Sequence, residues 1–429
     1  DDARARLIRQ LSAFDWGLVR ELAQLVKEQT FGPEIAEFKP APVVPLSRPA
    51  EEVAEARRTG EAAVREGTVA AFVVAGGQGS RLRFDGPKGC YRIGPVSGKS
   101  IFQIHAERVL AAGLRYGVEI PLYVMTSETN DAQVREFFEQ NELFGLPAQD
   151  VAFCTQRMLP AFDAEGRLFL DAPDHVFVSP DGHGGSYRAL QSSGALDDMA
   201  RRGVRHISYF QVDNPMVPAI DPVFIGEHVR TGSEMSSKVL KKREPREKLG
   251  VFADIDGALR VVEYSEMDDA LQRKTLPDGS LKYAFGSIAV HAIDIDFARR
   301  MASADLPFHV AHKAIPVRGD GGEAAEPDEP NGFKLERFVF DGIPHARNPL
   351  VMEVRREDEF APVKNLDGDD SPATARAAMM AQHRRWLRQA GVDVPERGVV
   401  EISPLFALDA EELKGKVSRL PVSDNLYLE

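Results

Sequence analysis

Short apolar runs alternate with segments of helical periodicity through the centre of the chain. Residues 69–75 form an apolar run as long as a buried strand, and residues 100–112 repeat apolar positions at helical spacing. The pattern continues with strands predicted at 122–126, 176–178, 206–212, 237–240 and 251–253, and a helix at 130–141. This alternation predicts an α/β fold built on a doubly wound, mixed sheet. Ligands bind such sheets beyond the carboxyl ends of the strands, so the loops after the strands should carry the chemistry.

Two further regions flank this centre. Residues 1–66 form a helical N-terminal region, in which two helical segments are separated by the proline-rich stretch 40–45. The central domain is expected to span residues 67–365, with a surface loop at 319–329 that is rich in Gly, Asp and Glu. The pattern changes after residue 365, and a small C-terminal domain is expected over 366–429, with a helix at 373–390 and strands at 399–408.

Composition and charge narrow the possible functions. Hydrophobic residues make up 43% of the chain and charged residues 28%, as in ordinary globular proteins. We expect no membrane span and no secretory leader, and hence a cytoplasmic protein, because no apolar run approaches the ~20 residues of a span. The net charge of −13 argues against nucleic-acid binding. A phosphate-bearing substrate must therefore be held by a few local basic residues and backbone N–H groups. The only cysteines, Cys90 and Cys154, exclude a disulfide framework and are expected to be reduced thiols.

A glycine-rich loop follows the first predicted strand. It reads Gly-Gly-Gln-Gly-Ser-Arg-Leu from Gly76 to Leu82 and continues to Lys88. Glycines let backbone N–H groups close on a phosphate, and Arg81 and Lys88 add positive charge. The loop is not a Walker A motif, and Leu82 stands where a dinucleotide fingerprint needs its third glycine. A plain surface turn is the alternative, which the added basic residues disfavour.

The loop resembles the signature of sugar-nucleotide pyrophosphorylases. Further blocks resemble the eukaryotic-type UDP-N-acetylhexosamine/UDP-sugar pyrophosphorylase family, in one order from about residue 71 to residue 365. These blocks are 100–108, 158–161, 180–190, 212–214, 262–266, 330–336, 338–341 and 356–365. The resemblance implies a Rossmann-like nucleotidyltransferase core. It also implies an enzyme that joins UTP to a sugar-1-phosphate and releases pyrophosphate and a UDP-sugar. The sugar-phosphate oxygen is already an anion, so positioning and charge neutralisation should carry the catalysis without a general base.

The resemblance assigns nucleotide contacts to the loop and to two later segments. Ala75, Gly76, Gly77 and Arg81 are expected to hold the nucleotide phosphates, and Lys88 to neutralise charge on the transferring α-phosphate. Gln156 matches the uracil-binding glutamine of the family, since an amide offers both the donor and the acceptor that a uracil edge requires. From the residue alone, satisfying the end of a strand is the commoner role for Gln156. Gly182 is expected to let the backbone approach the base or the ribose.

Metal and sugar-phosphate contacts are assigned in the same way. Asp213 follows the predicted strand 206–212 and is the expected Mg²⁺ ligand, because Mg²⁺ prefers carboxylates together with substrate phosphates. In isolation, an Asp-Asn pair after a strand is more often a turn. Lys364 matches the lysine that binds the sugar phosphate, and Gly250 and Glu263 match positions that contact the sugar. The basic run that starts at Lys238 is expected to be a solvated loop; its other members are Lys241, Lys242 and Arg243.

Two departures from the family pattern concern the choice of sugar. The N-acetylhexosamine enzymes have asparagine where His183 stands, and Ser287 replaces a second asparagine that would contact the sugar. An unmatched buried amide costs about 1–3 kcal/mol, enough to reverse a preference. We therefore expect glucose-1-phosphate to be slightly favoured, with N-acetylglucosamine-1-phosphate a close second.

Two other functions stay open at this stage. A non-catalytic sensor or scaffold that binds nucleotide sugars could keep the same fold. Retention of Arg81, Lys88, Asp213 and Lys364 argues against it, because a mere binder need not keep charges that serve the transition state. A nicotinamide-dependent oxidoreductase is disfavoured by the broken dinucleotide fingerprint.

Overall fold

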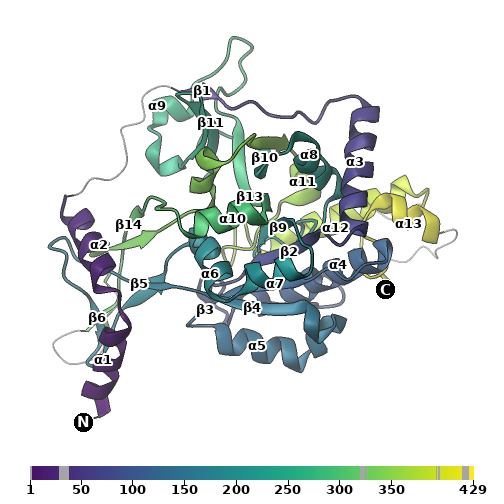
Figure 1. Cartoon of the computed structure of the whole chain (residues 1–429). Helices are drawn as coiled ribbons and strands as arrows, with labels where there is room; N and C mark the ends of the chain where they lie inside the picture. The colour runs from purple at the N-terminus through teal and green to yellow at the C-terminus, as the bar shows by residue number, and fades with distance from the viewer. Residues whose placement is uncertain are drawn as a thin grey trace.

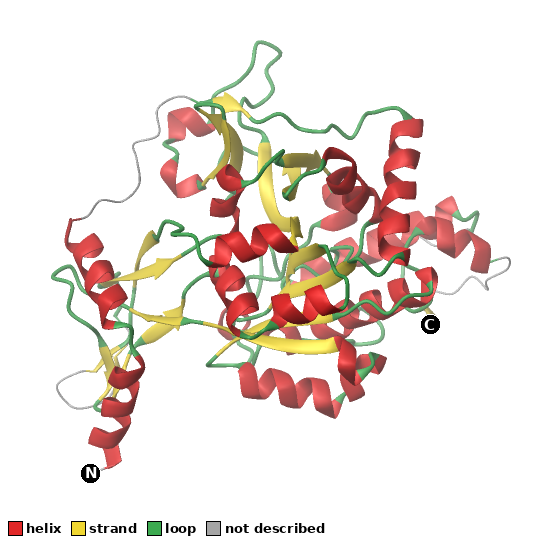
Figure 2. Cartoon of the chain, viewed as in Figure 1, coloured by secondary structure: helices red, strands yellow, loops and turns green. Residues whose placement is uncertain are grey.

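The computed structural model confirms an α/β architecture around one mixed sheet (Figures 1 and 2). It describes residues 2–28, 38–318, 324–325, 327–392, 394, 397–417 and 425–429. Four parallel strands lie side by side in the order β9, β2, β3, β4. Their bounds are His206–Gln211, Val69–Val74, Leu122–Ser127 and Val151–Gln156.

The sheet continues beyond β9 through an antiparallel strand. Strand β13 (Phe285–Asp294) runs antiparallel to β9, so its first residues lie at the same sheet edge as the carboxyl ends of the parallel strands. Strand β10 (Met235–Lys241) pairs with β13, and β18 (Leu350–Glu353) pairs in parallel with β10. The hairpin of β11 and β12 (Val251–Ile255 and Ala258–Val262) and the short β1 (Lys39–Pro40) complete this part.

Helices cover both faces of the sheet. Successive side chains of a strand point to opposite faces, and where both sets are apolar, both faces must be covered. In β2, Val69, Ala71 and Val73 face one hydrophobic cluster, while Ala70, Phe72 and Val74 face the other. The first cluster includes residues of α3, α4, α5, α8 and α12, and the second includes residues of α6, α7 and α10. The bounds on the first face are Ala50–Arg65, Ile101–Tyr116, Asp131–Gln140, Pro222–Thr231 and Pro372–Gln389. Those on the second are Ser186–Ser192, Ala195–Arg201 and Ile295–Ala302. The doubly wound prediction is confirmed.

The N-terminal helices pack against a separate group of short strands. Helices α1 (Asp2–Ala13) and α2 (Trp16–Glu28) lie on the opposite side of the sheet from α13 (Figure 1). Residues of α2 form a hydrophobic cluster with Leu159, Phe162 and Leu335. These residues lie in or beside two of the small sheets, β5 with β8 and β14 with β17. Their bounds are Met158–Pro160, Val178–Pro180, His309–Lys313 and Gly332–Glu336.

The C-terminal segments form a small hydrophobic cluster of their own. Strands β19 (Val399–Ile402) and β20 (Asn425–Leu428) pair in parallel, and Leu387, Val400 and Leu413 are buried between α12, β19 and α13 (Ala410–Lys416). The strand predicted over 403–408 is wrong beyond Ile402. The Ser403 carbonyl accepts hydrogen bonds from Phe406 N and Ala407 N, so the chain turns there. Most of the predicted loop 319–329 lies outside the described residues. No helix in the described part of the chain has both the length and the apolar character needed to cross a bilayer.

Candidate active site

The glycine-rich loop leaves β2 at the carboxyl edge of the sheet. Buried side chains anchor its start: Asn130 Nδ2 donates to the Ala75 carbonyl at 2.9 Å, and Ser127 Oγ donates to the Gly76 carbonyl at 3.0 Å. The loop then folds back on itself, with Gly79 N 2.9 Å from Gly86 O and Lys88 N 3.2 Å from Gly77 O. Arg81 lies exposed at the tip. These contacts preorganise a loop whose N–H groups and basic side chains can bind phosphate.

Gln156 and Gly76, both expected to contact the nucleotide, lie against each other. Gln156 ends β4 and is 5% exposed. A Cβ added at Gly76 would lie 2.3 Å from Gln156 Nε2, so any side chain there would displace the amide. Nothing lies within 4 Å of a Cβ at the neighbouring Gly77. Gly76 therefore makes room for Gln156, while Gly77 faces open space.

Lys88 and Asp213 meet beyond the carboxyl ends of β2 and β9. Lys88 Nζ lies 3.7 Å from Asp213 Oδ2, and both side chains are mostly buried. The Asp213 carbonyl accepts a hydrogen bond from Val363 N at 2.8 Å, which places Lys364 in the adjoining turn. The Asp370 carbonyl accepts from Lys364 N at 2.7 Å and closes that turn. Three of the four charged residues expected to act on phosphates or their metal ion, Lys88, Asp213 and Lys364, thus come together from segments distant in the sequence.

The expected sugar-contacting residues also come together. Ser287, near the start of β13, donates its N–H to the Gly250 carbonyl at 2.8 Å. A Cβ at Gly250 would lie 2.7 Å from Glu263 Oε1, so the carboxyl group lies over the glycine. Burial raises the pKa of Glu263 to about 7, the negative charge of Glu266 adds to this rise, and Lys364 opposes it. Glu263 therefore lies in electrostatic contact with the lysine expected to bind the sugar phosphate.

His183 is held by aromatic residues. Its ring stacks on Phe338 with centroids 5.0 Å apart, and its Nδ1 accepts a hydrogen bond from Val339 N at 3.1 Å. Burial, followed by the charge of His309, lowers the pKa of His183 to about 4, so the ring is neutral at physiological pH. Phe340 and His309 complete this cluster.

Gly182 approaches backbone of the same segment. It has a φ of +83°, and a Cβ there would lie 2.4 Å from the Arg337 carbonyl oxygen. The neighbouring Gly184 N donates to that oxygen at 2.7 Å, and Arg337 N donates to the Asp181 carbonyl at 2.8 Å. The absence of a side chain at Gly182 therefore lets the segment 181–184 pack against the backbone of Arg337. Whether the glycine also admits a base or a ribose stays a prediction.

The prediction of a solvated basic loop from Lys238 onward is wrong for Lys242, which is 8% exposed and donates its Nζ to the Pro245 carbonyl at 2.7 Å, and for Lys238. This lysine lies within β10 and its side chain is fully buried. Its Nζ lies 2.6 Å from both Asp221 Oδ2 and Glu359 Oε2. Two carboxylates thus compensate the buried charge, which is the condition for such a lysine to be tolerated.

Several neighbours of the site were not identified from the sequence. His309 lies 3.0 Å from Asp341 Oδ2, and although burial alone would lower the pKa of His309, the hydrogen bond to Asp341 raises it. Asp370, with a φ of +54°, interacts electrostatically with Lys364 and Asp213. No motif in the sequence around His309 or Asp370 points to the site, because only the fold brings these two residues to it.

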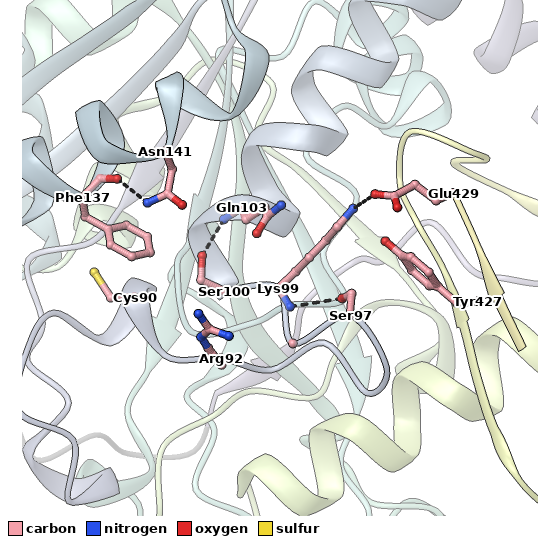
Figure 3. A pocket seen from close by; sticks show the side chains of 11 residues that line it. Cys90, Arg92, Ser97, Lys99, Ser100, Gln103, Phe137, Asn141, Tyr427 and Glu429 are labelled. Carbon is pink, nitrogen blue, oxygen red and sulfur yellow. Dashed lines mark hydrogen bonds and ion pairs between the residues drawn. The ribbon is translucent and has the colours of Figure 1, made fainter. Parts of the chain in front are cut away.

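A separate cavity of about 360 Å³ is lined in part by the segment from Cys90 to Gln103, which follows the loop in the sequence (Figure 3). Lys99, Ser100 and Gln103 line it together with Tyr427 and Glu429 of the C-terminal segment. Lys99 Nζ is already neutralised there, at 2.8 Å from Glu107 and 3.2 Å from Glu429. None of the predicted site residues lines this cavity.

The comparisons with known proteins identify the family of the chain. A model of the family described as UTP–glucose-1-phosphate uridylyltransferase matches residues 24–420. The chain belongs to this family. It is therefore a nucleotidyltransferase of the UTP–sugar-1-phosphate class.

Named relatives of this uridylyltransferase cover most of the chain. A "UDP-N-acetylhexosamine pyrophosphorylase-like protein 1" of Xenopus tropicalis is 39% identical over 85% of this chain and 77% of its own. A UDP-N-acetylglucosamine pyrophosphorylase of Saccharomyces cerevisiae is 38% identical over 90% of this chain and 84% of its own.

Solved structures extend the likeness to the fold. A UDP-N-acetylglucosamine pyrophosphorylase of Trypanosoma brucei aligns with a TM-score of 0.86 at 28% identity, covering 100% of this chain and 93% of that one. A UDP-glucose pyrophosphorylase of Leishmania major aligns with a TM-score of 0.65 at 16% identity, covering 96% and 86%, and shares the fold.

Proposed function

We propose that this uridylyltransferase joins UTP to N-acetylglucosamine-1-phosphate, forming UDP-N-acetylglucosamine and releasing pyrophosphate, with Mg²⁺ as its cofactor. The observation that carries the reaction is the convergence of Lys88, Asp213 and the Lys364 turn beside the glycine-rich loop, with Lys88 Nζ 3.7 Å from Asp213 Oδ2. The lysines supply positive charge for the phosphates, and Asp213 supplies negative charge for the metal ion beside them.

The chain's own residues account for the steps of the transfer. The loop N–H groups and Arg81 hold the triphosphate, and Gln156, fixed over Gly76, reads the uracil edge. Lys364 orients the sugar phosphate so that its oxygen attacks the α-phosphorus in line with the departing pyrophosphate. Lys88 neutralises the charge that develops on the α-phosphate oxygens.

The residues fit a magnesium ion. Asp213 is a carboxylate at the carboxyl edge of the sheet, and its side chain keeps 19% of its surface exposed toward the site. Mg²⁺ is typically held by one or two carboxylates together with substrate phosphates and waters, so one aspartate is sufficient. The ion would supply charge neutralisation on the phosphates of UTP, and Asp213 would hold it there.

The acetylated sugar is favoured by the relatives, and this replaces the slight preference for glucose-1-phosphate. The reported relatives at 39% and 38% identity and the solved structure at 28% identity carry N-acetylhexosamine or N-acetylglucosamine in their names, whereas the UDP-glucose pyrophosphorylase structure is only 16% identical. The stacked rings of Phe338 and the neutral His183 offer apolar surface that suits an acetyl methyl group. The hydroxyl of Ser287, next to Gly250, is a hydrogen-bonding group for the sugar or its amide.

The test of this proposal separates the reaction from the sugar. Pyrophosphate release is measured with UTP, Mg²⁺ and either N-acetylglucosamine-1-phosphate or glucose-1-phosphate, for the wild type and for the Ser287→Asn variant. We expect the wild type to prefer the acetylated sugar and Ser287→Asn to change the ratio of the two kcat/KM values. A wild-type preference for glucose-1-phosphate would overturn the sugar assignment and leave the reaction standing.

A further inference from the structure

Two histidines and an aspartate from three elements meet at the sheet edge opposite the glycine-rich loop. His206 is the first residue of β9 and Asp294 the last of β13, and the two are direct partners in the strand register. His228 comes from the last turn of α8. Because β9 rises about 3.3 Å per residue, its ends at His206 and Gln211 are about 17 Å apart, and Asp213 lies beyond Gln211. The cluster is therefore remote from the phosphate chemistry.

The three side chains present donor atoms at the spacing of a metal site. His206 Nδ1 lies 2.8 Å from Asp294 Oδ1, and His228 Nε2 lies 2.9 Å from the same oxygen. All three donor atoms lie within 4.8 Å of one another. Ligands of a tetrahedral zinc ion, at about 2.0–2.1 Å from the metal, are about 3.3 Å apart. Moving Asp294 Oδ1 about 0.5 Å farther from the two nitrogens would thus reach the spacing of zinc ligands.

The surroundings hold the ligands in place and leave one side open. His228 is fully buried, and its Nδ1 lies 2.8 Å from Ser236 Oγ, which fixes the ring in the way that outer partners of metal-bound histidines do. The Asp294 side chain is 33% exposed and that of His206 14% exposed, so an ion and a water ligand have access.

No other charged group occupies the cluster in the part of the chain that the structure describes. The ion pairs of Asp294 there are those with His206 and His228. The nearby Glu234 is bound by Arg300 and Arg347, and Arg205 pairs with Glu66. One carboxylate oxygen therefore faces two imidazole nitrogens and no lysine or arginine.

We propose that His206, His228 and Asp294 bind one divalent transition-metal ion of the zinc type, which ties together β9, β13 and α8. Two imidazole nitrogens and one carboxylate suit zinc, cobalt or nickel, whereas magnesium prefers oxygen ligands. The site is thus distinct in chemistry and in place from the carboxylate expected to hold Mg²⁺.

Direct metal titration tests this proposal on the full chain. Tag-free protein is stripped with a chelator, dialysed, and titrated with Zn²⁺ by calorimetry, without nucleotide; Co²⁺ then reports nitrogen ligation through its visible absorption. We expect one saturable site per chain with micromolar or tighter affinity. Zn²⁺ should also raise the melting temperature, because an ion that binds only the folded state stabilises it.

Matched variants locate the ion. His228→Gln, His206→Gln and Asp294→Asn should each weaken Zn²⁺ binding by at least about 100-fold. The control His175→Gln removes an exposed histidine that also contacts an aspartate, Asp171, at 2.6 Å, and should leave binding unchanged. Circular dichroism confirms that each variant is folded, and His206→Gln, at the partly exposed position, keeps the test valid if His228→Gln does not fold.

Three results would overturn the site. They are a wild type without a saturable site, equal binding by the wild type and the folded ligand variants, and a Co²⁺ spectrum without nitrogen ligation. In each case the cluster would be only a hydrogen-bonded contact between strands and helix.

Discussion

The buried charge of Lys238 gives the sharpest prediction about the stability of the core. Its side chain is fully buried, and Asp221 and Glu359 lie within 2.6 Å of its Nζ. Burial alone would lower the pKa of Lys238, but the two carboxylates raise it, so the amine stays charged. The Glu359 carbonyl also accepts a hydrogen bond from Asn214 Nδ2 at 2.7 Å, which links this cluster to the residue after Asp213.

Replacing Lys238 with methionine keeps most of the side-chain volume and removes the charge. Two carboxylates would then be left buried without a cation, and breaking a buried ion pair in this way costs about 3–5 kcal/mol. Urea unfolding of the wild type and Lys238→Met at about pH 8 measures this loss directly. The matched control is Lys241→Met on the same strand, because Lys241 is 65% exposed and its pair with Glu353 is worth about 0–1 kcal/mol.

The destabilisation should depend on pH in a defined direction. In the wild type, burial already raises the pKa of Glu359 to about 7, while burial alone would raise the pKa of Asp221 but Lys238 lowers it. Without the amine, burial and mutual repulsion raise the folded-state pKa of Asp221 above its unfolded value and that of Glu359 further above its own. A carboxyl group whose pKa is raised in the folded state stabilises that state while it is protonated. This contribution is fully present below the unfolded pKa and is lost as the pH rises through the folded pKa. The difference between Lys238→Met and the wild type should therefore be smaller at about pH 5 than at about pH 8. Equal costs for Lys238→Met and Lys241→Met at pH 8 would refute the reasoning.

Three further predictions concern the site. Lys88→Met should lower kcat by about 10²–10⁴-fold with an unchanged melting curve, because it removes charge stabilisation of the transferring phosphate; unaltered turnover would contradict that role. Gly76→Ala should raise KM for UTP by displacing Gln156, whereas the control Gly415→Ala on α13, where nothing lies within 4 Å of an added Cβ, should change it little, and similar effects of both would argue against this packing. Because the pKa of Glu263 is raised to about 7 mainly by burial, ionisation between about pH 6 and pH 8 should lower KM for the sugar phosphate. The same pH dependence in Glu263→Gln would show that another group titrates.

The central sheet could be predicted because its strands are short, continuous runs of apolar residues in the sequence. Residues of β2 are apolar on both faces, so the run reads as a buried parallel strand whatever surrounds it. The turn at 403–408 shows the limit of this signal. It is also largely apolar, but Pro404 and the hydrogen bonds to Ser403 end the strand.

The site itself depended on contacts that no local pattern contains. Lys238 looks like part of a solvated basic run, because its partners Asp221 and Glu359 lie 17 and 121 residues away. His183 was interpreted as a pocket residue from its place in a glycine-rich block. Its stacking on Phe338 and its bond to Val339 depend on a segment more than 150 residues later. Roles for Lys88 and Asp213 came from the family resemblance, and the fold supplied their proximity.

The most direct test of the proposed function is pyrophosphate release from UTP and Mg²⁺ with a panel of sugar-1-phosphates. The panel holds N-acetylglucosamine, N-acetylgalactosamine, glucose and galactose as their 1-phosphates. We predict the highest kcat/KM with N-acetylglucosamine-1-phosphate and a loss of turnover in Lys88→Met. Absence of release with every sugar, from folded protein that still binds UTP, would contradict the catalytic function and favour a nucleotide-sugar-binding role.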